Sequence, residues 1–229
     1  MKLKISEQII EKYPELEIGV VIVKGVNNNG NEKTLLCEIE DKVKNEIESE
    51  TIKEIPSIAK WKEVYKSFGS KPSKYRNSAE ALLKSALTRG IPTINRLVDI
   101  YNHISLKYKM TVGGEDVEKI EGDLVLDFAK GDEEFYSIGS EENDSPKEGE
   151  VVYKDDKGIV CRRWNWREAD RTKLTEETKD AVVVIENLIS EESGKLKEAL
   201  EEMKSLIEEK GGAECEIKIL YKNSLEVEI

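Results

Sequence analysis

The segment YNHISLKYKMTVGGED, residues 101–116, carries the most promising chemistry in the sequence. Adjacent glycines such as Gly113 and Gly114 let a backbone approach a ligand closely and expose its N–H groups. The carboxylates of Glu115 and Asp116, which follow, could bind an ammonium group or hold a water molecule. On spacing alone, a glycine turn with solvated acids is the simpler interpretation.

The chain contains one histidine, His103, which lies beside Asn102 in an expected amphipathic helix. A histidine in such a place is most often structural, and a zinc site would need unusual partners. Cys37, Cys161 and Cys215 are odd in number and lack CxxC spacing, which argues against a disulfide framework and against zinc. We therefore expect three reduced thiols and no metal or other cofactor.

The segment CRRWNWREADRT, residues 161–172, places Trp164 and Trp166 among four arginines. Aromatic planes next to guanidinium groups can stack on bases and hold phosphates. In a strand, however, the two tryptophans would share one face and could simply belong to the core. Both interpretations stay open at this point.

Signatures of the common hydrolase, nucleotide-binding and zinc-protease sites are absent: there is no GxSxG, no GxxxxGK[ST], no GxGxxG after a strand and no HExxH. At 229 residues and 38% hydrophobic, the chain can bury one core, and we expect a single soluble domain over residues 1–229. No window approaches the roughly 18 apolar residues of a membrane span, so we expect a cytoplasmic protein without a membrane partner.

The net charge of −12 speaks against a polyanionic partner, but it hides an asymmetry. Residues 58–110 contain eleven Lys or Arg against three Asp or Glu, a local charge of +8. A phosphate-bearing ligand could dock on such a segment, although solvated helix faces would give the same count.

Apolar spacing predicts the elements that must position these residues. Helices are expected over 32–54, 57–68, 78–89, 91–108 and 191–210, and strands over 19–26, 124–128, 134–138, 150–153, 159–163 and after residue 212. The run VVVI, residues 182–185, fits a helix or a strand. The pattern indicates an α+β fold with mixed or antiparallel sheets flanked by helices.

Residues 61–186 resemble the tRNA-binding and editing domain of the phenylalanyl-tRNA synthetase beta chain, and especially its freestanding version. The resemblance rests on the ordered motifs FG-KPS-R-S-EALL, P-IN-LVD-YN-IS, GG-D-(E)KI-G and RRWNWR. It implies an α+β domain with a cleft that, inside the synthetase, receives the aminoacylated end of tRNA and hydrolyses wrongly attached amino acids such as tyrosine. Residues 187–229 would complete the fold with a helix and a strand.

The resemblance also implies site residues. Asn102 matches the asparagine of the family's Thr-Asn pair, and Tyr101 replaces the threonine. The family's LHAFD segment aligns with VGGED, so Gly113 stands in place of the editing histidine, Gly114 in place of the alanine, and Asp116 matches the aspartate.

The acid of the family's GGExS segment falls at Asp170, with Thr172 at the serine and Thr178 at a later threonine. Because the histidine is replaced, Glu115 and Asp170 become candidates for binding the substrate's α-ammonium or side chain. The implied function is hydrolysis of mischarged aminoacyl-tRNA in trans, and the alternative is a non-catalytic tRNA- or amino-acid-binding module. A structural protein with neither role is a third possibility.

An aminoacyl ester is already activated, so a water held by Asn102 and the main chain of Gly113 and Gly114 could hydrolyse it without a protein nucleophile. We assign catalysis to these residues and Asp170. Substrate contacts are assigned to Tyr101, Glu115, Asp116 and Trp166, and tRNA contacts to Lys71, Lys74, Arg76, Arg162, Arg163, Trp164 and Arg167. The expected partners are the aminoacylated end of tRNA and its amino-acid moiety, and not DNA.

Overall fold

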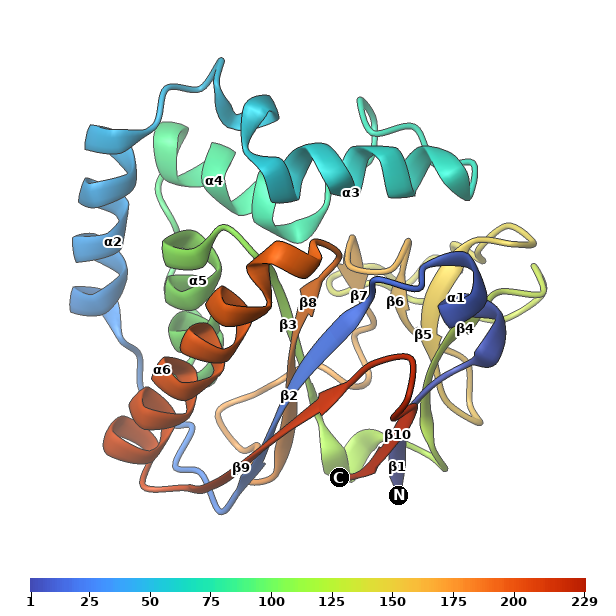
Figure 1. Cartoon of the computed structure of the whole chain (residues 1–229). Helices are drawn as coiled ribbons and strands as arrows, with labels where there is room; N and C mark the ends of the chain where they lie inside the picture. Colours follow the sequence, from blue (N-terminus) through green and yellow to red (C-terminus); the bar gives the residue numbers. More distant parts are fainter.

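A four-stranded antiparallel sheet occupies the centre of the computed structural model, which describes residues 1–229 (Figure 1). In spatial order its strands are β3 (Thr111–Asp116), β8 (Ala181–Asn187), β2 (Glu17–Lys24) and β9 (Glu214–Leu220). The two inner strands, EIGVVIVK and AVVVIEN, are rich in β-branched residues, which pack well on pleated, buried surfaces. β3 lies at one edge, so only one side of its backbone is paired within the sheet.

Helices cover one face of this sheet, as Figure 1 shows on the left. α5 (Arg96–Tyr108) and α6 (Ser193–Gly211) pack on the strands, α4 (Ser78–Thr88) contacts β3, and α2 (Lys33–Glu46) packs against α4 and α5 farther from the sheet. α5 and α6 contribute Ile100, Ile104, Leu200 and Met203 to an apolar cluster with the strand residues of this face. The spacing of three and four residues between these side chains gives each helix one apolar stripe.

A second, six-stranded sheet lies on the other side. In spatial order its strands are β10 (Glu226–Glu228), β1 (Lys2–Ile5), β4 (Leu124–Phe128), β5 (Val151–Lys154), β6 (Ile159–Arg162) and β7 (Arg167–Glu168), with β1 and β4 parallel and the other pairs antiparallel. The largest core cluster joins residues of both sheets with those of α1 (Glu7–Lys12) and α3 (Pro56–Ser67). The α+β class with mixed and antiparallel sheets is therefore confirmed.

Several of the expected elements differ from the structure. The helix expected over 32–54 ends at Glu46, and a single 3-10 turn, Ile52–Glu54, follows it. The segment 91–95 is not helical, because the Asn95 side chain caps α5 by accepting from the Val98 N–H (3.1 Å). The segment 134–138 has only an isolated bridge at Ser137. The glycine pair forms the middle of β3 and is not a turn, and VVVI is a strand.

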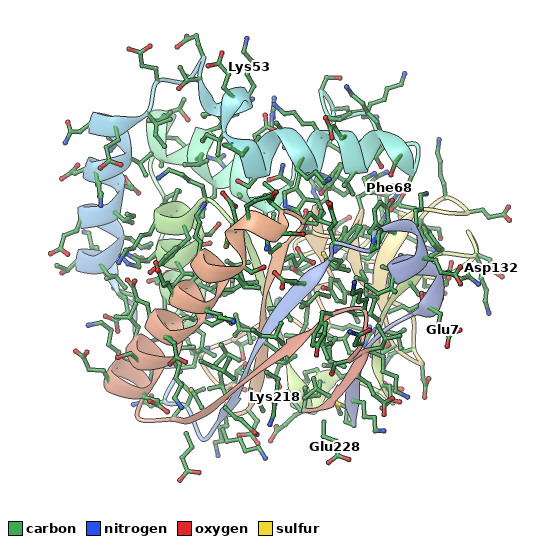
Figure 2. All side chains as sticks on the ribbon, in the orientation of Figure 1. Glu7, Lys53, Phe68, Asp132, Lys218 and Glu228 are labelled. Carbon is green, nitrogen blue, oxygen red and sulfur yellow. The ribbon has the colours of Figure 1, made fainter.

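Charged side chains occur all around the outline of the molecule, and the labelled Lys53, Asp132 and Glu228 point away from it (Figure 2). None of the helices has the length and apolar character needed to cross a membrane.

Candidate functional site: a cleft beside β3

The start of α5 is anchored to the loop that follows β7. Asn95, which caps the helix, also donates from its side chain to the carbonyl of Leu174 (3.0 Å). Asp99 in the first turn accepts from the N–H groups of Ile94 and Glu32 (2.9 Å each). These bonds fix the face of α5 that carries Tyr101 and Asn102.

Two adjoining hollows form a cleft along this face of α5. The first, of about 330 Å³, lies between α4, α5 and the turn after β6, and Asn102, Trp166 and Arg167 line it. The second, of about 500 Å³, lies between α5, the edge of β3 and the loop 173–176. Ile94, Tyr101 and Glu168 line both, and we call the two hollows together the cleft.

A third, much smaller cavity of about 20 Å³ lies behind the cleft, between the two sheets. This volume is about what one water molecule requires. Three glutamates, Glu115, Glu168 and Glu186, line it, together with Tyr153 and Trp164. Glu168 therefore lines both the cleft and the small cavity.

Glu186 is held by three hydrogen bonds. Its Oε1 accepts from the Tyr153 hydroxyl (2.8 Å), and its Oε2 accepts from Asn165 Nδ2 (2.6 Å) and the Thr111 hydroxyl (2.9 Å). Asn165 in turn accepts from the Tyr65 hydroxyl of α3 (2.8 Å). Burial nevertheless dominates and raises the pKa of Glu186 to about 7.

Glu115 and Glu168 lie beside each other, and neither forms an ion pair, although the charge of Arg171 acts weakly on Glu115. Burial, followed by the like charge of Glu168, raises the pKa of Glu115 well above its usual range. Burial also raises the pKa of Glu168. Two adjacent buried carboxyl groups resist a second ionisation, so the pair keeps a proton more readily than two solvated acids would. The same carboxylates and burial raise the pKa of the Tyr101 phenol, which stays neutral.

The two glycines of β3 differ in the direction of their N–H groups. The Val117 N–H donates to Asp180 at the start of β8, whereas the Asp116 N–H donates away from the sheet, to Thr172 (2.9 Å). Because strand backbone direction alternates, the Gly113 N–H points to β8 and the Gly114 N–H points off the edge, where Gly114 lines the cleft. A Cβ at position 113 would lie 3.0 Å from Glu168 Oε1. The expectation of two bare amides is corrected to one.

The WNWR segment is a turn, and it separates the two tryptophans. Arg163 (φ 46°) and Trp164 (φ 67°) adopt left-handed conformations. Trp164 points into the core, 0% exposed, with ring centroids 5.0 Å from those of Tyr13 and Trp61. Trp166 is half-buried at the cleft. Trp164 therefore belongs to the core, and only Trp166 is placed where it could stack on a base. The assignment of Trp164 to tRNA contact is corrected.

Arg162 and Arg163 are also unavailable to tRNA, which corrects their assignment. Arg162 is 1% exposed and donates to both carboxylate oxygens of Glu150 (2.8 and 3.0 Å). Arg163 is 5% exposed, with its guanidinium carbon 3.7 Å from the ring centroid of Tyr75 and 4.3 Å from that of Trp166. Both arginines bind other parts of the protein and hold the turn in place.

Three predicted acids lie outside the cleft lining. Asp116 is buried, accepting from Glu118 N–H (3.1 Å) and the Thr178 hydroxyl (2.7 Å), so its role is structural. Asp170 is half-exposed and pairs with Lys173 (2.7 Å). Glu115 lines the small cavity and not the cleft.

The histidine is placed away from the cleft, as expected for a structural residue. His103 is largely buried, with Nδ1 3.4 Å from the Leu35 carbonyl and Nε2 3.4 Å from Glu202 Oε1. Burial lowers its pKa, so it is neutral at pH 7.

Exposed cations gather on the α4 side of the cleft. Arg89 and Arg167 line the first hollow and are exposed. Tyr75 packs edge-on against Trp166 (centroids 4.9 Å apart), which brings the exposed Lys74 and Arg76 near the same opening. Lys71 belongs to the same exposed loop.

Sequence reasoning missed Glu168 and Glu186. A single carboxylate at the end of the β-branched run AVVVIE was a signal for a buried acid, since exposed acids normally alternate along a strand. Glu168 follows WNWR directly but has no local pattern that distinguishes it from the other surface acids.

Comparison with solved structures gives a similar fold. A crystal structure of an N-terminal fragment of the phenylalanyl-tRNA synthetase beta subunit from Pyrococcus horikoshii aligns with a TM-score of 0.51 and 14% identity, over 98% of this chain and 53% of that one. This chain thus spans about half of that fragment. No curated protein matches this chain. The B3/4 domain model matches residues 60–212, more than half of the chain, and the chain therefore belongs to the B3/4 domain family, of the type found in phenylalanyl-tRNA synthetase beta subunits.

Proposed function

We propose that the protein hydrolyses mischarged aminoacyl-tRNA in trans. The observation that carries the proposal is the cleft around Tyr101, where the Asn102 amide, the free edge of β3 at Gly114 and a carboxylate line adjoining space. The cleft is large enough for an amino acid and the ribose that carries it.

The chemistry requires positioning more than a protein nucleophile. Ser85 and Ser105, which line the cleft, donate to the carbonyls of Gly90 (2.9 Å) and Met110 (2.7 Å). The hydroxyl of the third serine, Ser78, is buried and has no base beside it, so a water molecule is the better nucleophile. An ester bound across Tyr101 would have the Asn102 amide on one side to orient that water. On the other side, the Gly114 N–H could donate to the developing oxyanion.

Exposed cations at the opening support a nucleic-acid ligand despite the net charge of −12. Arg89 and Arg167 line the first hollow, with Lys74 and Arg76 beside it. Trp166 is half-buried there, with the guanidinium carbons of Arg163 and Arg167 4.3 and 4.7 Å from its ring centroid, and the exposed part of its ring would contact a terminal base. These groups would bind phosphates of the acceptor end, whose attraction depends on salt.

A panel of tRNAs charged with cognate and non-cognate amino acids tests the proposal. We expect at least one charged tRNA to be deacylated with multiple turnover, and Asn102→Ala to lower kcat about 100-fold or more, the usual cost of removing a transition-state contact. Asn45→Ala, which changes an exposed asparagine of α2, is the matched control and should retain full activity.

Arg167→Ala should raise KM with little change in kcat and reduce the salt dependence of KM. If no charged tRNA is deacylated faster than in buffer, the proposal is wrong. Salt-dependent tRNA binding without turnover would then identify a non-catalytic binding module.

A further inference from the structure

The small cavity behind the cleft has an unusual electrostatic character. None of its three glutamates forms an ion pair, whereas the neighbouring buried Glu150 is held by Arg162 (2.8 Å). Buried carboxylates are normally paired or fully hydrogen-bonded, because removing a charge from water costs several kcal/mol. Glu186 meets this requirement with three donors.

Glu115 and Glu168 do not meet it. Oε2 of Glu115 and Oε2 of Glu168 have no donor in good hydrogen-bond geometry, although Glu115 is only 6% exposed. The polar groups nearest to them are the other carboxyl of the pair, the Thr172 hydroxyl and the Cys161 thiol, none of which is a cation. Both carboxyl groups face the small cavity, and Glu168 also faces the cleft. The junction of cleft and cavity therefore presents acceptors to any group that enters it.

A primary ammonium group has the matching chemistry. It offers three donors and no acceptor, carries the opposite charge, and is about the size of one water molecule. The cavity volume of about 20 Å³ suits a group of that size. A ligand in the cleft can contact Glu168 directly, because Glu168 lines both hollows of the cleft.

We propose that Glu168, backed by Glu115, binds the primary ammonium group of the ligand in the cleft. The identity of that group as the α-ammonium of an aminoacyl ester rests on the proposed function. Gly113 belongs to the same site, since a Cβ there would lie 3.0 Å from Glu168 Oε1 and would shift that carboxylate by a few tenths of an ångström.

Protonation of the carboxyl pair competes with this binding. Affinity for an ammonium ligand should thus rise with pH as the pair loses its proton, while affinity for a neutral ligand should not change. Several titratable or charged groups face the carboxyl groups of Glu115 and Glu168. They are Tyr153 on β5, Cys161 on β6, Glu186 on β8, Tyr101 on α5, and Arg171 and Lys173 in the loop after β7. Burial raises the pKa of Glu186 to about 7, so its ionisation accompanies that of the pair, and Glu186→Gln isolates its contribution.

The test is calorimetric titration with two probes that cannot be hydrolysed as esters. One is 3′-L-alanylamino-3′-deoxyadenosine, and the other is its propionyl counterpart, which lacks the ammonium group. Alanine is chosen because its methyl group is small enough to fit a pocket that accepts any larger amino-acid side chain. We expect the wild type to bind the alanyl probe about 10- to 100-fold more tightly, as a charged hydrogen bond implies.

Glu168→Gln should reduce the ratio of the two affinities, alanyl over propionyl probe, to about threefold or less and leave the affinity for the propionyl probe unchanged. Glu115→Gln keeps a neutral donor beside Glu168, so it should preserve the ratio and flatten its pH dependence between pH 5 and 8. Glu177→Gln removes an exposed carboxylate from the loop next to the cleft and is the matched control.

The inference is overturned if the wild-type ratio is near one, if Glu168→Gln leaves the ratio unchanged, or if neither probe binds. These outcomes are separate from the deacylation assay, because the titration requires no turnover. A protein that shows the expected ratio but hydrolyses no charged tRNA would refute the proposed function and retain the ammonium site.

Discussion

The buried Glu186 makes the stability of this protein depend on pH in a calculable way. Its carboxyl group has a pKa of about 7 in the folded protein, against an ordinary value of 4.5. Between these two pH values the folded state retains a proton that the unfolded state has lost. The free energy of unfolding should therefore fall as the pH rises through this window, and the loss should be complete above pH 7.

The size of the effect follows from the difference in pKa. At 1.36 kcal/mol per unit, Glu186 contributes roughly 3 kcal/mol in full, of which about 2.5 kcal/mol falls between pH 5 and pH 8. Glu115 and Glu168, whose pKa values are also raised, add to the fall with the same sign. The contribution of Glu186 is isolated by Glu186→Gln, which keeps the shape of the side chain and cannot ionise.

Urea unfolding at pH 5 and pH 8 measures this contribution. The fall in unfolding free energy should be about 2.5 kcal/mol smaller in Glu186→Gln than in the wild type, or about 1 M in urea midpoint for a slope of 2–3 kcal/mol per molar. A constant offset between the two proteins, from an altered hydrogen bond, does not affect this comparison. Glu38→Gln, at an exposed position of α2, should follow the wild type. Parallel curves for wild type and Glu186→Gln would refute the reasoning.

Two substitutions test the tryptophans and one tests the glycine pair. Trp164→Ala should lower the free energy of unfolding by about 3–5 kcal/mol, because the indole is fully buried. Trp166→Ala should mainly weaken tRNA binding, by about 1–3 kcal/mol. Denaturation measures the first effect and filter binding the second, and equal losses of stability in the two variants would contradict the assignment. Gly113→Ala should fold but displace Glu168 and reduce the preference for the alanyl probe at least about threefold, an outcome that an unchanged preference would contradict.

Apolar periodicity was enough to predict the α+β class and most of the longer helices, but it missed α1 and extended the helix that ends at Glu46 to residue 54. The apolar spacing of α5 is a local feature, and the helix expected over 78–89 agrees with α4 (Ser78–Thr88) to within one residue. The strand expected over 124–128 is β4, with those bounds. In each case the apolar residues of the buried face lie three or four positions apart in a helix, or two positions apart in a strand.

The candidate site was less predictable because its determinants are distant in sequence. The glycine pair has the local pattern of a turn, but β3 is a strand because β8, about seventy residues further on, pairs with it throughout. Arg162 looked like a free cation, and its partner Glu150 lies on the neighbouring part of the sheet. Strand alternation placed both tryptophans on one face, and left-handed backbone at two residues other than glycine reversed that arrangement.

The family resemblance implies that Gly113 stands in place of the editing histidine, and a side chain at position 113 would meet Glu168. A side chain at position 113 would point into the space that the Glu168 carboxylate fills, since even a Cβ would lie 3.0 Å from Oε1. A histidine at 113 and Glu168 in its present conformation therefore exclude each other. The polar group beside position 113 is the carboxyl of Glu168, on β7 of the six-stranded sheet, and a second carboxyl, that of Glu115, lies next to it. A neutral imidazole can bind a hydroxyl oxygen as donor or acceptor, but a carboxyl pair favours a cation. Discrimination between substrates at this point should thus depend on a positive charge on the ligand, and not on a phenolic hydroxyl as a tyrosine-directed site would require.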